Sequence, residues 1–362
     1  MPLEKRLFVL AGAALLAACS RGPSGTVLLG AAGPLSGANG EANRKGFELA
    51  LEQINNTPGR SFKFGAIVAD DSANGGRAAI VAQEFVSNPG IVAVVGHVNS
   101  GTMMAAARVY DGHLAAVATS ATSPSLSGIS KWAFRVISSD SLNGQRVATH
   151  MNKLGKRRAM ILYENNSYGR GLAESFRRGF SGEVLGMDPV SDKAGEDLEP
   201  FVSWIKQKQA DLVFVAGTDA SGRALLKEAR KQQLNAAFAG GNGWAVLAND
   251  PNAEGAYFPT PFNARDPRPD VQAFVAAYKA KYNGEEPSAY AALAYDATKL
   301  IAQAVDRVGA DRVRIRDYLA NLSEPYKGVT GDVVFGSNGD PKGKQMAIAR
   351  IHDRSILAEA AQ

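Results

Sequence analysis

Residues 91–109 read IVAVVGHVNSGTMMAAARV, and this stretch decides the fold class. It aligns without a gap with LVFVAGTDASGRALLKEAR at 212–230. Each copy has an apolar run, a glycine, a polar loop, then Ser-Gly and a segment with helical periodicity. A strand that leads through a loop into a helix is the unit of a parallel α/β sheet. The two copies predict two lobes of the same design, although any two strand–loop–helix units look alike to some degree.

Apolar runs and helical stretches alternate along most of the remaining chain. The helical stretches carry apolar residues at i, i+3, i+4 and i+7, as in Phe47, Ala50, Leu51 and Ile54. In open α/β sheets ligands bind beyond the carboxyl ends of the strands, so the two repeat loops should face a shared cleft. Examples of the expected strands are 26–31, 64–69, 91–95, 115–118, 158–163, 212–216 and 236–239.

The first nineteen residues have the composition of a secretory signal. A basic pair precedes an apolar run, and the segment closes with LAAC at residues 16–19. This ending resembles the lipobox of bacterial lipoproteins, which predicts a signal peptide at 1–18, lipidation at Cys19 and a lipidated linker at 19–25. The alternative is an ordinary signal peptide in which Cys19 is incidental. The remaining chain is expected in the periplasm or at the cell surface, where ATP and nicotinamide cofactors are absent.

The composition and the missing motifs argue against a disulfide-stabilised protein, a nucleic-acid-binding protein and an enzyme. Cys19 is the only cysteine in 362 residues, so a disulfide cannot hold the domain and its core must suffice. The formal net charge is +5, and +4 without residues 1–18. The basic clusters at 156–158 and 177–178 lack interleaved aromatic residues, which indicates solvated faces and no nucleic-acid partner. The histidines lack metal-site spacing and the GxSxG, GxxxxGK[ST] and GxGxxG motifs are missing, so we expect no enzyme, cofactor or metal.

Six segments in chain order carry a family resemblance: GPLSGANG (33–40), VADDSANGGRAAIVAQEFV (68–86), VVGHVNSGT (94–102), TSATSPSLS (119–127), YENNSYGRGLAESF (163–176) and AALAYDATKLIAQAV (291–305). They resemble the bacterial extracellular solute-binding proteins of the leucine/isoleucine/valine type, the receptors of ABC importers. The resemblance implies a type I periplasmic binding protein fold: two Rossmann-like parallel-sheet lobes, joined by three hinge crossings, that close on the ligand. By chain order, lobe one comprises 26–139 plus 262–335, and lobe two comprises 140–261 plus 336–362.

Ser100 and Gly101 open a predicted helix that continues to residue 110. Helix N-termini favour carboxylates because their backbone N–H groups are free and the dipole is favourable. The resemblance implies that Ser100 binds a ligand carboxylate. An N-cap role for Ser100 fits the same position.

The resemblance also assigns roles to the segment Ser120, Ala121 and Thr122. In the family, the backbone of the first residue and the threonine hydroxyl grip the substituents on the ligand's α-carbon; a simple strand-end turn is the alternative. Tyr168 corresponds to an aromatic residue that covers the ligand from lobe two, unless it only packs between the lobes.

Two departures from the family affect the expected ligand. Amino-acid receptors of this family carry a glutamate that faces the ligand ammonium, and this chain has Asn242 in that place. An unpaired buried cation is costly, so either Asp219, which follows Thr218 in the repeat loop, replaces the acid, or the ligand lacks an ammonium. Of these two we favour a ligand without an ammonium. The loop after residues 36–37 is also short and lacks the family's aromatic residue, for which Trp244 is the expected substitute.

The sequence therefore predicts a lipid-anchored monomer that captures an amino acid or related small carboxylate and delivers it to the permease of an ABC importer. A second hypothesis is a sensory or regulatory envelope lipoprotein that keeps the binding-protein fold, which Asn242 favours if the cleft has lost its ligand. An extracellular hydrolase is the third, and no motif supports it.

Overall fold

A computed structural model describes residues 25–191 and 197–359. The expected signal peptide, Cys19 and the linker up to residue 24 lie outside the described residues. Within the described ranges, no helix combines the length and apolar character that crossing a membrane requires.

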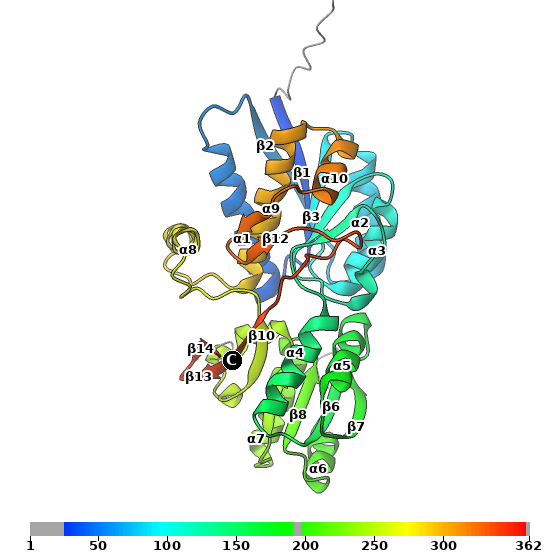
Figure 1. Ribbon diagram of the computed structural model, residues 1–362, viewed down its shortest axis with the longest axis vertical. Coiled ribbons are helices and arrows are strands. Elements are labelled where there is room, and N and C mark those ends of the chain that lie inside the picture. Colours follow the sequence, from blue (N-terminus) through cyan, green and yellow to red (C-terminus); the bar gives the residue numbers. More distant parts are fainter. Residues whose placement is uncertain (1–24, 192–196, 360–362) are drawn as a thin grey trace, which may run out of the picture.

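The main strands form two separate sheets (Figure 1). The first contains β1 (Gly25–Gly33), β2 (Phe62–Asp70), β3 (Ile91–Gly96), β4 (Ala115–Ala118) and β5 (Ala133–Arg135). The second contains β6 (Arg158–Glu164), β7 (Glu183–Val190), β8 (Leu212–Ala216), β9 (Ala237–Gly240), β10 (Tyr257–Thr260), β13 (Ala347–His352) and β14 (Ser355–Ala358). A small hairpin joins β11 (Tyr326–Gly328) to β12 (Gly331–Val333).

The two sheets share one strand order. The first is parallel throughout, in the order β2-β1-β3-β4-β5. The second repeats this order as β7-β6-β8-β9-β10, also parallel, and the antiparallel strands β13 and β14 extend its edge. The repeated segments 91–109 and 212–230 thus begin with β3 and β8, which hold equivalent places. The expected two-lobe α/β fold with mostly parallel sheets is confirmed.

Helices cover both faces of each sheet. In lobe one, α1 (Ala38–Asn55), α8 (Pro269–Lys281), α9 (Ala289–Val308) and α10 (Arg312–Ala320) share an apolar core with one face, and α2 (Gly75–Ser87) and α3 (Ser100–Tyr110) with the other. In lobe two, α4 (Asp140–Lys153) and α5 (Ser167–Gly179) pack on one face, and α6 (Glu199–Gln207) and α7 (Asp219–Lys231) on the other. Three 3₁₀ segments complete the elements: η1 (Pro124–Leu126), η2 (Asn242–Asn249) and η3 (Pro251–Ala253).

Burial on both faces explains the composition of the central strands. Every residue of β3 and β8 is buried, and both strands are continuous apolar runs because helices cover them on each side. Small residues set the helix spacing in lobe one. A Cβ at Gly46 of α1 would lie 2.0 Å from the Ala291 carbonyl oxygen of α9, so these helices pack backbone to backbone.

The chain passes between the lobes three times. It leaves the first sheet after β5, returns after β10 to form α8, α9 and α10 on lobe one, and leaves again after β12 to form β13 (Figure 1). The proposed lobe boundaries at 139/140, 261/262 and 335/336 lie between elements in these three stretches.

Candidate functional site

A cavity of about 340 Å³ lies between the lobes. Its walls come from loops at the carboxyl ends of the central strands and from the helices that follow, the place where open α/β sheets bind ligands. The volume falls in the range of small-molecule sites. The lining residues are Ala73, Gly75, Val98, Asn99, Ser100, Gly101, Thr102, Ser120, Glu164, Asn166, Tyr168, Thr218, Asn242, Gly243 and Tyr290.

The lobes contact each other directly through hydrogen bonds. The side-chain amide of Asn39 in lobe one donates to Asp219 Oδ1 of lobe two at 3.1 Å. Near η1, the Ser123 hydroxyl donates to the Ser167 carbonyl oxygen at 3.0 Å.

The N-terminus of α3 forms the donor wall of the cavity. Asn99 is its N-cap, but the Asn99 side chain caps no backbone N–H, which leaves the first turn open beside Gly101 and Thr102. Ser100 is the first helical residue and not the cap, so its alternative role as N-cap is wrong. The N-terminus of α5 differs, because Asn166 Oδ1 accepts from two N–H groups there.

The Ser100 hydroxyl is arranged as a donor. Its oxygen accepts from the backbone N–H of Thr122 at 3.2 Å and of Ser123 at 3.1 Å. A hydroxyl has two acceptor lone pairs and one proton, so both lone pairs are used. No acceptor for the proton occurs among the described residues at hydrogen-bond distance, and Ser100 lines the cavity. The hydroxyl is therefore free to donate to a ligand oxygen.

Two further oxygens of the lobe-one wall lack a protein partner. The Ser120 hydroxyl and Asn99 Oδ1 are buried and make no hydrogen bond within the described chain. Buried polar groups normally find partners, so both atoms are suited to contact a polar ligand.

Lobe two contributes acceptors. Glu164 ends β6 with its carboxylate at the cavity wall. The Tyr168 hydroxyl donates weakly to Asn242 Oδ1 at 3.4 Å. Burial raises the pKa of both Tyr168 and Tyr290, and the negative charges of Glu164 and Asp219 add to the rise. Both phenols therefore stay protonated and neutral.

The comparisons with known proteins fit this geometry. A family model described as periplasmic binding protein matches residues 26–355. The chain belongs to this family. An amino acid binding protein of Pseudomonas aeruginosa is 29% identical, with 91% of each chain covered. Both names describe binding proteins and not enzymes, in agreement with the expectation from the sequence.

Solved structures of the family resemble the whole of the described chain. The branched-chain amino acid transporter substrate binding protein LivJ from Streptococcus pneumoniae, in complex with isoleucine, is 28% identical with a TM-score of 0.85, covering 92% of this chain and 98% of that one. An ABC transporter substrate-binding protein from Desulfitobacterium hafniense, in complex with leucine, is 28% identical with a TM-score of 0.82, covering 92% and 100%.

The structure brings together six of the ten expected ligand-binding residues of this family member. These are Ser100, Gly101, Ser120, Tyr168, Thr218 and Asn242. Ala121 and Thr122 are fully buried behind the cavity wall. Thr122 shapes the site through its backbone N–H on Ser100, and its side chain lies beside Asp140 instead of in the cavity.

Trp244 and Asp219 lie elsewhere than expected. Trp244 does not supply apolar area to the cleft: it is fully buried in the core of lobe two, where its indole fills the space above Gly222 and Gly240. A Cβ at Gly240 would lie 2.1 Å from the indole ring, so glycine is required beneath it. Asp219 is half-buried, contacts Asn39 across the lobes, and is not part of the cavity wall.

The sequence reasoning missed Glu164, Asn166 and Tyr290 as wall residues. A signal existed for Glu164, since an acidic residue at the carboxyl end of a buried parallel strand lies where such sheets bind ligands. Tyr290 lies in the first turn of α9, and the apolar periodicity of a helix does not show which of its ends meets the other lobe.

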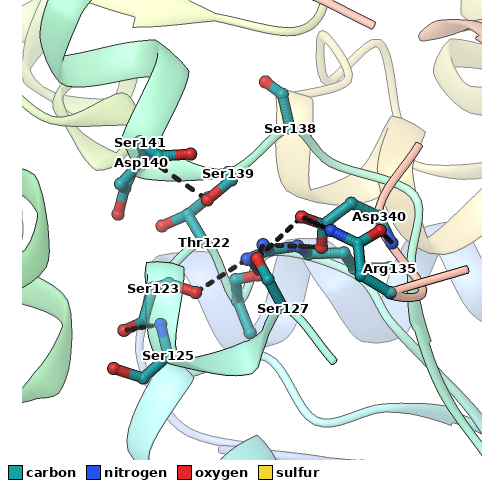
Figure 2. Close-up of polar contacts among 12 residues, drawn as sticks. Thr122, Ser123, Ser125, Ser127, Arg135, Ser138, Ser139, Asp140, Ser141 and Asp340 are labelled. Carbon is teal, nitrogen blue, oxygen red and sulfur yellow. Dashed lines mark hydrogen bonds and ion pairs between the residues drawn. The ribbon is translucent and has the colours of Figure 1, made fainter. Parts of the chain in front are cut away.

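Arg135 links the wall of lobe one to Asp340, in the third stretch between the lobes, which connects β12 to β13 (Figure 2). Its guanidinium is almost fully buried and donates to the Ser123 carbonyl oxygen at 2.9 Å, the Ser127 hydroxyl at 2.8 Å and Asp340 Oδ1 at 2.7 Å. Ser127 also donates to Asp340 at 2.7 Å. The loop that carries Ser120 is thereby held to the segment between β12 and β13.

The histidines with contacts of note lie outside the cavity wall. His97 is buried, with Nδ1 2.7 Å from Asp71 Oδ2 and Nε2 3.1 Å from the Tyr110 hydroxyl. His352 lies on the surface, with Nδ1 2.8 Å from Glu254 Oε1; with Asp353 these residues form an exposed group of potential metal ligands. Neither arrangement touches the site between the lobes.

Proposed function

We propose that this protein is an extracytoplasmic solute receptor that captures an amino acid or related small carboxylate between its lobes and delivers it to the permease of an ABC importer. The observation that carries the proposal is the α3 terminus, where open backbone N–H groups and the proton of the Ser100 hydroxyl converge on one cavity. A carboxylate is the group that such a donor cluster stabilises.

The identities of the relatives support this choice of ligand class. Two solved structures at 28% identity hold leucine and isoleucine, and the names of both proteins describe them as transporter substrate-binding proteins. The LAAC sequence at residues 16–19 supports a lipid anchor at Cys19, which would hold the receptor near its permease. We expect the receptor to act as a monomer.

A sensory or regulatory lipoprotein is the second candidate, because Asn242 replaces an acid that the family uses. The cavity between the lobes and the unpartnered oxygens in its wall weigh against a lost ligand. Thermal unfolding of the purified protein with amino acids, amides and aromatic acids separates the two. A ligand at about 100 times its Kd adds about 2.7 kcal/mol of stability. Absence of a thermal shift with every compound would contradict the receptor function.

A further inference from the structure

Glu164 is a buried acid, and no lysine, arginine or histidine within residues 25–191 and 197–359 forms an ion pair with it. It is 1% exposed, ends β6 and forms part of the cavity wall. A buried carboxylate is normally paired or held by several donors, because removing its charge from water is costly. The partners of the Glu164 carboxylate therefore show whether its charge is compensated within the protein.

The partners of Glu164 are all neutral. Oε1 accepts from the Thr218 backbone N–H at 2.8 Å, the Thr218 hydroxyl at 2.5 Å and the Ser221 hydroxyl at 3.0 Å. Oε2 accepts only from the Asn166 side-chain amide at 3.1 Å. A carboxylate offers about four acceptor positions, so Oε2 keeps one for another donor. The neutral contacts fix the carboxylate in place and leave its charge uncompensated.

The charge of Glu164 sets the electrostatic character of the lobe-two side of the cavity. In the described parts of the chain, the wall includes no lysine, arginine or histidine, and Glu164 is its one charged side chain. The opposite wall is the open N-terminus of α3 with the Ser100 hydroxyl. The cavity thus has a donor-rich side on lobe one and a negatively charged side on lobe two, which complements a dipolar ion.

We propose that Glu164 binds the ammonium of the solute and so replaces the acid that Asn242 lacks. The proposal rests on the proposed function, since it assumes that a carboxylate binds at Ser100. It selects zwitterionic amino acids over simple carboxylic acids, and it assigns the acid to Glu164 instead of Asp219. It also reverses the sequence-based preference for a ligand without an ammonium.

The test uses pairs of compounds that differ only in the amino group. Wild-type protein and Glu164→Gln are titrated by calorimetry with L-leucine and 4-methylpentanoate, and with L-phenylalanine and 3-phenylpropanoate. The wild type should bind at least one amino acid about 30-fold or more tightly than its deaminated twin, because truncating a buried charge pair costs this much or more. Glu164→Gln should reduce this preference to less than about threefold while the deaminated twin binds as before.

Asp219→Asn is the competing variant, since Asp219 lies outside the wall and bonds to Asn39. It should keep the preference for the amino group. Should Glu164→Gln fail to fold, Glu164→Asp retains the charge, withdraws it by one methylene, and should lower the preference by about tenfold.

Three results would overturn the proposal. Equal wild-type binding of both twins would refute the role of Glu164 and leave carboxylate capture intact. If Asp219→Asn loses the preference for the amino group and Glu164→Gln keeps it, Asp219 and not Glu164 binds the ammonium. Failure of these four compounds and of every compound in the thermal-unfolding screen to bind would overturn the proposed function, and this proposal with it.

Discussion

Replacing Ser100 by alanine removes two kinds of contact at once. The hydroxyl proton would no longer reach the solute carboxylate, and the backbone N–H groups of Thr122 and Ser123 would lose their acceptor. The first loss weakens binding, and the second weakens the fold of the wall loop. An assay must therefore measure the two separately.

The expected magnitudes follow from these contacts. A hydrogen bond to a charged group contributes about 1.5–3 kcal/mol, so Ser100→Ala should raise Kd about 10- to 150-fold. Each buried N–H left without an acceptor costs about 1–3 kcal/mol, so the free energy of unfolding should also fall.

Calorimetric titration with L-leucine, at a temperature where the variant is fully folded, isolates the change in affinity. Asn55→Ala is a suitable control for the stability loss. The Asn55 side chain exchanges two hydrogen bonds with the Phe64 backbone at 2.8 Å each and does not line the cavity. Leucine binding by folded Ser100→Ala within about twofold of wild type would refute the donor argument. Equal losses of affinity in both variants would point to stability alone.

Three further predictions concern the anchor, a buried acid and helix packing. Cys19→Ala should move the protein from the membrane fraction to the soluble fraction or stall its processing; identical fractionation of both forms would argue against lipidation. Burial raises the pKa of Asp140 to about 6, so ionisation costs wild-type stability as pH rises from about 4 through 6. Asp140→Asn avoids this cost, and urea unfolding should show its stability relative to wild type improving by about 2–2.5 kcal/mol between pH 4 and 7.5, whereas a constant difference would contradict the assignment. Gly46→Ala would place a Cβ 2.0 Å from the Ala291 carbonyl oxygen and should lower the free energy of unfolding by about 1–3 kcal/mol; an unchanged urea midpoint would show that the helices separate freely.

Local patterns were sufficient for the central strands and for several helices of the fold, but not for β5, β7 and β10. The helix expected from Ser100 to Tyr110 has these bounds in the structure, because a Ser-Gly-Thr start and apolar periodicity are both local signals. The strand expected at 236–239 runs from Ala237 to Gly240 instead, since hydrogen bonding to β8 sets its end. The edge strands β13 and β14 depend on pairing with β10, which neighbouring residues do not encode.

The sequence did not show which side chains point into the cavity, and this limited the prediction of the site. Trp244 follows Asn242 closely in sequence, but the 3₁₀ turn of η2 directs one side chain to the cavity and the other to the core. The burial of Trp244 depends on Gly222 and Gly240, which are not its neighbours in sequence. Neither glycine has a side chain, and this leaves room for the indole. Glu164 belongs to the same sequence motif as Tyr168, but only the three-dimensional structure shows that its hydrogen-bond partners among the described residues are neutral.

The Arg135 cluster predicts the order of events when a solute arrives. Residues 338 and 339 accept backbone hydrogen bonds from Gly128 and Arg135 of lobe one, at 2.8 and 3.1 Å, so the segment that carries Asp340 packs on lobe one although chain order assigns it to lobe two. The contacts of Arg135 with Asp340 and Ser123 therefore lie within lobe one and hold its half of the site in place when the lobes part. A solute therefore meets a preformed surface first, at a rate proportional to its concentration. Lobe two then swings over it at a rate independent of concentration. Rapid mixing should give an observed rate that reaches a plateau, and the dwell time of the solute should equal the reciprocal of the reopening rate.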